Sequence, residues 1–151
     1  MERLPIEENG ATRERLVATV KSLSDAEFAS AIDGGWTIAQ SLAQLAFWDR
    51  WAEQLLRRWR SGQMPPPSVP DWYDDAINQA LIAQWRAIPV GAAGALAVEA
   101  SAAVDHQIAH LETPVQAAIT ASGESSHLVH RHRYRAAALD RIDRTLGRTG
   151  N

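Results

Sequence analysis

The sequence contains no cysteine and no long run of apolar residues. Without cysteine, the chain cannot form a disulfide, a thiolate nucleophile or a Cys-ligated zinc or iron–sulfur site. No apolar run approaches the roughly 20 residues that a membrane-spanning helix needs. The first eight residues, MERLPIEE, also lack the apolar region of a secretory signal. We therefore expect a cytoplasmic protein that does not bind a membrane.

The chain also lacks a large net charge and the alternating residue pattern of a β-strand. The chain has 15 Lys and Arg against 18 Asp and Glu, a formal net charge of -3, and this balance disfavours nucleic-acid binding. No segment alternates apolar and polar residues as a half-buried strand does. Instead, 27 alanines against 9 glycines favour helix. The 151 residues are enough for one core, so we predict a single domain over residues 1–151.

Helical periodicity predicts four long helices, at residues 8–22, 37–61, 90–110 and 125–146. A shorter helix is predicted at 71–87, inside the middle connection, and a brief one at 113–122. Ser24 and Glu27 have the spacing of a capping box, and Thr37 is the expected N-cap of the second long helix. Four prolines between 63 and 70 predict a loop. These elements are typical of a four-helix bundle with an inserted helix.

Three segments follow the patterns of one known family. Residues 35–50 read GWTIAQSLAQLAFWDR, residues 71–78 read DWYDDAIN, and residues 134–142 read YRAAALDRI. They resemble the G-x-W-[ST]-x-x-[DE]-x-L-x-H-L-x-x-W-[DE] segment, the D-W opening and the H-x-x-x-H-L-x-x-I ending of the DinB-like (DinB/YfiT) superfamily. The resemblance covers roughly residues 5–146. It implies an all-α fold, a DinB-like four-helix bundle with up-down-down-up connectivity and a short extra helix in the middle connection, and often a homodimer.

The resemblance also implies where a metal site would be. Members of the family usually hold a divalent metal, such as zinc or nickel, with one histidine on the second helix and two at i and i+4 on the last. The matching positions here are Gln44, Tyr134 and Ala138. Alanine cannot ligate, a glutamine carbonyl is a weak ligand, and tyrosine must lose a proton with a pKa of about 10. We therefore expect no cofactor at this site.

A pocket at Gln44, Trp48, Tyr134 and Ala138 is expected in place of the metal centre. Gln44, Trp48, Trp51 and Leu55 share one helix face by their spacing. An inward Gln44 amide needs a hydrogen-bond partner, and Tyr134 is the natural candidate, with water or a ligand as alternatives. For Trp36, Trp48, Trp51 and Trp59, core packing is the favoured role and a pocket wall the alternative, because aromatic side chains dominate core burial.

The histidines suggest a different metal site. His106 and His110 are one helical turn apart at the end of the third long helix, and His127 and His130 begin the last one. A bundle-end cluster of these four residues is one hypothesis. The simpler interpretation is that His106 and His110 are exposed histidines interacting with the helix dipole. A shifted register would pair His130 with Tyr134, but it abandons the match at Leu139 and Ile142.

The remaining charged side chains are expected to be structural. Alternate residues of a helix spread around it, so the run from His130 to Arg135 predicts a solvated surface rather than an anion site. Ordinary helix-surface or capping roles are expected for Asp33, Asp49, Glu53, Asp71 and Asp105. No Ser-His-Asp order, phosphate loop or H-E-x-x-H motif is present, and no catalytic residue is assigned.

Three functions stay open. The favoured one is a divergent DinB-like protein that lacks the three-histidine site and binds a small-molecule ligand, or at least is not catalytic. The first alternative is a metal- or thiol-dependent transferase or isomerase with an unorthodox site, because the family resemblance extends to thiol-dependent transferases and to the mycothiol-dependent maleylpyruvate isomerase type. The second alternative is a purely structural homodimer.

Overall fold

The fold is all-helical, as the sequence predicts. The computed structural model describes residues 3–32, 35–63 and 70–148, and these residues contain no strand beyond one isolated bridge between Ala31 and Thr37. The helices are α1 (Ile6–Ser22), α2 (Asp25–Phe28), α3 (Ile38–Arg60), α4 (Trp72–Ala87), α5 (Val90–Ala109), α6 (Thr113–Ser122), the 3-10 helix η1 (Glu124–Leu128) and α7 (Arg131–Thr145).

Local sequence signals set the starts of α2 and α3. The Ser24 hydroxyl accepts the Glu27 amide and the Glu27 carboxylate accepts the Ser24 amide, which confirms the predicted capping box. Thr37 caps α3 in the same way with Gln40, whose side-chain oxygen lies 2.8 Å from the Thr37 nitrogen. An amide oxygen accepts a hydrogen bond as a carboxylate does, so glutamine completes the box. The predicted loop at 63–70 lies largely outside the described residues.

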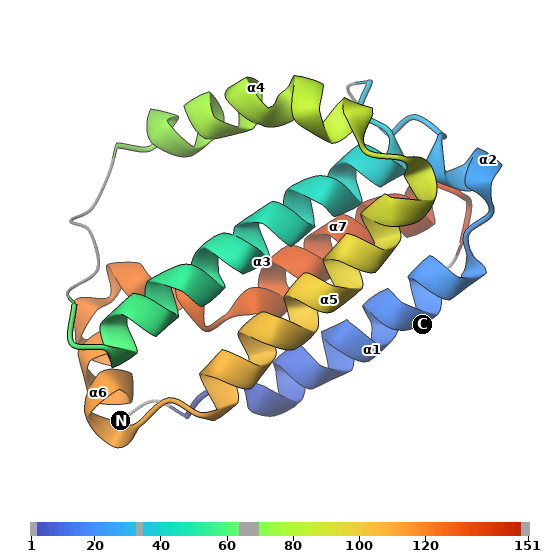
Figure 1. The fold of residues 1–151 in the computed structure, drawn as a ribbon. Coiled ribbons are helices and arrows are strands. Elements are labelled where there is room, and N and C mark those ends of the chain that lie inside the picture. Colours follow the sequence, from blue (N-terminus) through green and yellow to red (C-terminus); the bar gives the residue numbers. More distant parts are fainter. Residues whose placement is uncertain (1–2, 33–34, 64–69, 149–151) are drawn as a thin grey trace.

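Four long helices lie side by side. α3 packs along α5, α5 and α7 both contact α1, and α7 also contacts α3. In Figure 1, α3 and α5 run in one direction while α1 and α7 run in the other. The parallel course of α3 and α5 requires a return path, and α4 supplies it along the outer side of α3. Gly94 of α5 allows a close approach to α1, since a Cβ there would lie 2.7 Å from Val20 Cγ1.

A layer of buried polar side chains divides the apolar core into two clusters. The cluster near α2 includes Leu16, Phe28, Leu42, Ala97 and Leu139. The cluster near α6 includes Leu56, Val104, Ile108, Ile119 and Leu128. The intervening positions of the four helices are polar and buried: Asn9, Asp49, Ser101, Asp105, Arg131 and Arg135. We call these six residues the polar layer.

The last helix is shorter than the sequence predicts. A continuous helix over 125–146 is wrong, because the chain forms η1, breaks at Val129 and His130, and starts α7 at Arg131. The cause is Asn9 of α1, which is 1% exposed. Its side-chain nitrogen donates to the Val129 carbonyl at 2.8 Å, and its oxygen accepts the His132 amide at 2.8 Å. This cap comes from another helix, so the local sequence of the segment does not reveal it.

Candidate functional site

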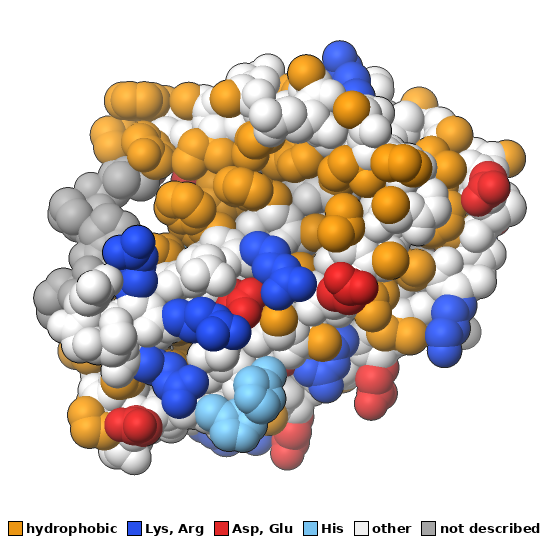
Figure 2. All heavy atoms as spheres, viewed as in Figure 1, with side chains coloured by type: hydrophobic (Ala, Val, Ile, Leu, Met, Phe, Trp, Pro, Cys, Tyr) orange, Lys and Arg blue, Asp and Glu red, His pale blue; other side chains and the backbone are white. Residues whose placement is uncertain are grey.

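A cavity of about 650 Å³ lies between α3, α4, η1 and α7. Its wall on α3 includes Gln44, Trp48 and Trp51, and its wall on α7 includes Arg131, Tyr134 and Ala138. Tyr73, Asp74 and Asn78 line it from α4. Hydrophobic side chains gather over α4 and the adjoining part of α3, as Figure 2 shows. The cavity therefore has a largely apolar wall on one side and arginine on the other.

All four residues of the expected pocket line this cavity. Gln44 and Trp48 are half-buried, Ala138 is buried, and Tyr134 is 47% exposed. The expected hydrogen bond between Gln44 and Tyr134 is wrong, as none joins them among the bonds of the described residues. Tyr134 instead lies over the Arg131 guanidinium, whose carbon is 4.6 Å from the ring centroid. Because Gln44 is only half-buried, its amide does not need a protein partner.

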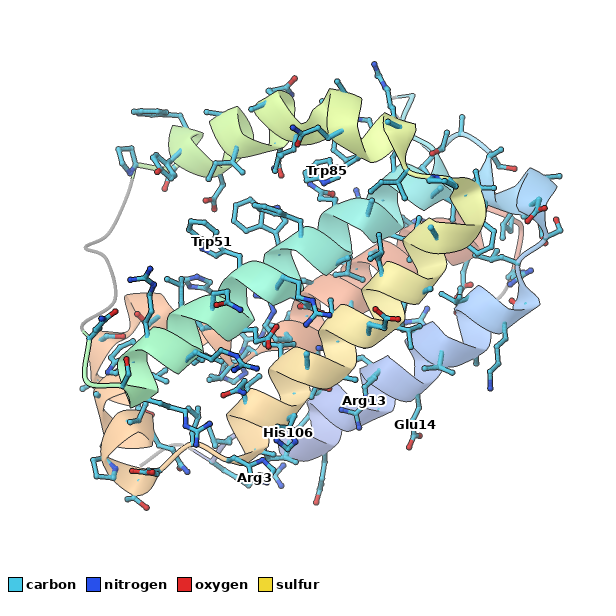
Figure 3. All side chains as sticks on the ribbon, in the orientation of Figure 1. Arg3, Arg13, Glu14, Trp51, Trp85 and His106 are labelled. Carbon is cyan, nitrogen blue, oxygen red and sulfur yellow. The ribbon has the colours of Figure 1, made fainter. Side chains whose placement is uncertain are left out.

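The tryptophans divide between core and cavity. Trp59 is 8% exposed and belongs to the core cluster near α6. Trp36 packs against Trp85, with ring centroids 5.7 Å apart. Trp48 and Trp51 line the cavity, and the Trp48 indole nitrogen donates to the Asn78 side-chain oxygen at 2.9 Å. Trp51 extends from α3 toward α4, and Trp85 from α4 toward α3 (Figure 3). Both roles left open by the sequence are therefore present.

Arg131 connects the cavity with the polar layer. It is 3% exposed, its Nε donates to Asp49 Oδ1 at 2.8 Å, and its Nη1 donates to the His127 carbonyl at 3.1 Å. Its remaining nitrogen, Nη2, is buried and has no hydrogen-bond partner in the described part of the chain. A buried donor without a partner costs about 1–3 kcal/mol. Arg131 therefore holds an unused donor while lining the cavity.

Ser41 is a second cavity-lining residue with an unpaired polar atom. Its hydroxyl is buried and has no partner among residues 3–32, 35–63 and 70–148. A serine hydroxyl can rotate toward the carbonyl four residues earlier in its helix. The Arg131 guanidinium is rigid and already fixed by two bonds. Arg131, unlike Ser41, therefore cannot satisfy its unpaired donor by a simple rotation.

Arg135 occupies the centre of the polar layer and is fully buried. Its Nη2 donates to Asp105 Oδ1 at 2.7 Å, and its Nε lies 3.3 Å from Asp49 Oδ2. It also donates to the backbone oxygens of Asn9 and Ser101. A single side chain of α7 thereby forms hydrogen bonds with α1, α3 and α5. Removing one partner of such a buried ion pair lowers stability strongly, because the remaining charge stays buried without its counter-charge.

The layer and its edge contain more positive than negative charge. Asp49 accepts from Arg131 and Arg135, and Asp105 accepts from Arg135 and from Arg13 of α1. The Arg13 side chain is 37% exposed, and Figure 3 shows it on the α5 side of α1. Three guanidinium groups therefore share two carboxylates.

The surface roles expected for several of these charges are wrong. Asp49 and Asp105 are buried, as are Arg131 and Arg135 of the basic run. The spacing of these residues in the sequence does indicate their burial. Asp49 continues the apolar stripe of Leu42, Leu45, Ala52 and Leu56, and Arg131 and Arg135 are one helical turn apart. Opposite charges at such core positions of two different helices can form an ion pair.

The other expected surface acids differ among themselves. Glu53 is 3% exposed and accepts hydrogen bonds from Arg50 and Arg57. Burial alone would raise the pKa of the Glu53 carboxyl, but those two bonds outweigh it and the pKa is lowered. Asp71 is exposed before α4 and forms no side-chain cap. Asp33 lies outside the described residues.

Among the described residues, the histidines form a close pair but no metal-binding cluster. His106 and His110 are exposed at the end of α5, with ring centroids 4.2 Å apart. In the part of the chain that the structure describes, no group of three or more His, Cys, Asp or Glu could hold a metal ion. The structure thus pairs His106 with His110 but does not join them to His127 or His130 in such a group.

The three positions where the resemblance implies metal ligands do not fit a divalent cation. Ala138 offers no donor atom, and the Tyr134 ring already covers a guanidinium group. Arg131 and Arg141 line the same cavity together with Asp74, so its lining carries more positive than negative charge and disfavours a cation.

Within the described helices, none is long and apolar enough to cross a membrane. The chain matches no family model, no curated protein and no solved structure.

Proposed function

We propose that the chain is a DinB-like four-helix bundle whose cavity binds a small organic molecule without a metal. Support for the bundle comes from the opposite directions of the α1/α7 and α3/α5 pairs and from the position of α4 between α3 and α5 in the chain. Support for binding comes from the cavity at the family's metal positions, Gln44, Tyr134 and Ala138.

The cavity itself is the observation that carries this proposal. Its volume of about 650 Å³ falls in the range of small-molecule sites, about 300–1,000 Å³. Such sites combine apolar and aromatic walls with a few polar groups. Trp48, Trp51 and Leu55 supply the apolar wall here, and Arg131 and Gln44 supply polar groups.

Binding is favoured over catalysis because the buried carboxylate that pairs with Arg131 is already committed. Asp49 accepts hydrogen bonds from two guanidinium groups, so both of its oxygens already have partners. The homodimer of the family stays a separate prediction, and sedimentation at low concentration tests it.

Binding of the neutral fluorescent probe N-phenyl-1-naphthylamine tests the proposal. We expect saturable one-to-one binding to the wild-type protein. Ala137→Trp, at an exposed cavity-lining position of α7, should fill the cavity and abolish binding. Ala80→Trp, at an exposed position of α4 that does not line the cavity, is the matched control and should bind normally. Equal binding by the two variants, or none by the wild type, would overturn the proposal.

Metal analysis tests the other half of the proposal. Purified protein incubated with zinc or nickel, and then dialysed, should retain less than stoichiometric metal by plasma mass spectrometry. Retention of one tightly bound equivalent that is lost in Gln44→Ala would contradict a metal-free site.

A further inference from the structure

The cavity adjoins a group of charges in which three guanidinium groups share two carboxylates. Asp49 is shared by Arg131 and Arg135, and Asp105 by Arg135 and Arg13. Each carboxylate therefore already accepts hydrogen bonds from two guanidinium groups. Of the three guanidinium groups, Arg131 is the one that lines the cavity. An additional anion that balances the layer is best placed from the cavity side.

The geometry of Arg131 defines what this anion must look like. Asp49 and the His127 carbonyl fix Nε and Nη1, and the Tyr134 ring covers one face of the guanidinium. Guanidinium N–H groups point outward in the plane of the group, so a stacked ring leaves them unsatisfied. The unpaired Nη2 therefore needs an acceptor in that plane. A carboxylate oxygen is such an acceptor, and its charge strengthens the bond.

The opposite wall selects an apolar body. Trp48 is held in place by Asn78, and Trp51 is 39% exposed beside it. Their ring centroids are 6.2 Å apart. Asp74 lines the cavity from α4, where it would repel an anion and direct the acidic end toward α7.

We propose that the cavity takes an amphipathic organic acid whose carboxylate bonds Arg131 and whose aromatic or long apolar body lies against Trp48 and Trp51. This assignment rests on the proposed function, since it names the ligand class of the same cavity. The carboxylate supplies the third negative charge, so that three guanidinium groups meet three anions. Tyr134 moves aside where the ligand approaches Nη2, and its 47% exposure leaves room for that movement.

Calorimetric titration with 4-phenylbutyrate and its neutral amide, 4-phenylbutanamide, tests the proposal on the wild-type protein. The two probes share their apolar body and differ in charge. We expect the acid to bind at least about ten-fold more tightly than the amide, as a charge-assisted bond allows. Equal affinities would overturn the proposal whether or not any variant folds.

Three methionine variants identify the arginine that is responsible. Arg131→Met should reduce the preference for the acid to less than about two-fold, as the carboxylate loses its only specific partner. Arg133→Met changes the same charge on the exposed side of α7, away from the cavity, and should keep the preference. If Arg141→Met removes the preference while Arg131→Met keeps it, the proposal is wrong. Circular dichroism establishes that each variant is folded.

The outcomes separate this proposal from the proposed function. If acid and amide bind equally and Ala137→Trp abolishes both, the cavity binds small molecules but the acid assignment fails. If N-phenyl-1-naphthylamine binds and neither phenylbutyrate nor its amide does, the acid assignment fails again. If no probe binds in a saturable manner, the proposed function fails, and the acid assignment with it.

Discussion

Arg131 and Arg135 are one turn apart on α7 and belong to two different regions. Arg135 lies inside the polar layer, where its donors reach two carboxylates and two backbone oxygens. Arg131 lies where the layer meets the cavity and has one nitrogen unpaired. The same residue type therefore has all its bonds to the protein in one region and keeps an unpaired donor in the other. The difference comes from what the neighbouring helices provide, not from the arginines themselves.

The largest expected effect is the loss of the shared carboxylate in the polar layer. Asp49→Ala leaves Arg131 and Arg135 without their common partner and should lower the free energy of unfolding by about 3–5 kcal/mol. Urea denaturation measures this change. Asp140→Ala removes an exposed carboxylate that pairs with Arg15 and should cost less than about 1 kcal/mol. Equal losses in the two variants would show that burial of the charge does not matter here.

The next effect concerns the start of α7. Asn9→Ala removes both the donor to Val129 and the acceptor for the His132 amide, and should cost about 1–3 kcal/mol. Asn9→Asp keeps the acceptor for the His132 amide but places a carboxylate oxygen against the Val129 carbonyl, so it should also be destabilising. Hydrogen exchange at the His132 amide should accelerate in Asn9→Ala and much less in Asn9→Asp. Unchanged exchange in both variants would argue against the cap.

A smaller effect is expected from pH. Burial, followed by the charges of His130 and Arg133, lowers the pKa of His132 below its ordinary value of 6.5. The unfolded chain therefore binds the proton more readily. The stability contributed by neutral His132 is complete above pH 6.5 and is lost as the pH falls through the lower folded pKa.

Urea midpoints at pH 7.5 and pH 5.5 measure this dependence. The difference between the two midpoints should shrink in His132→Gln. His106→Gln, at the exposed end of α5, should retain the full difference. A full difference in both variants would assign the pH dependence to other groups.

The smallest effect is expected on the cavity side. Gln44→Leu replaces a half-buried amide that has no bond to Tyr134, so the free energy of unfolding should change by less than about 0.5 kcal/mol. Probe binding should change instead, because Gln44 lines the cavity. A loss as large as that of Asp49→Ala would mean that the cavity wall is as structural as the polar layer.

Sequence reasoning succeeds where the cause is local. The caps at Ser24 and Thr37 use partners three residues away, so the printed order of residues contains all the information. The shared face of Gln44, Trp48, Trp51 and Leu55 follows in the same way from spacing, and all four line the cavity.

Sequence reasoning fails where the cause of a structural feature lies on another helix. Asn9 ends η1 and starts α7 from a distance of more than a hundred residues along the chain. Asp49 and Arg135 each look like misplaced surface charges until the other is placed opposite. The width of the cavity depends on the distance between α4 and α7, and the sequence of neither helix determines that distance by itself.

Arg135 also restricts how the helices can slide past one another. Much of the core cluster near α2 is alanine, including Ala39, Ala46, Ala93, Ala97 and Ala100. Such small, similar side chains present a smooth contact that by itself distinguishes poorly between neighbouring alignments of the helices. A one-turn displacement of α7 would instead pull a guanidinium away from acceptors on three helices at once. Arg135, together with the Arg131–Asp49 pair and the Asn9 cap, thus fixes the axial position of α7 in the core.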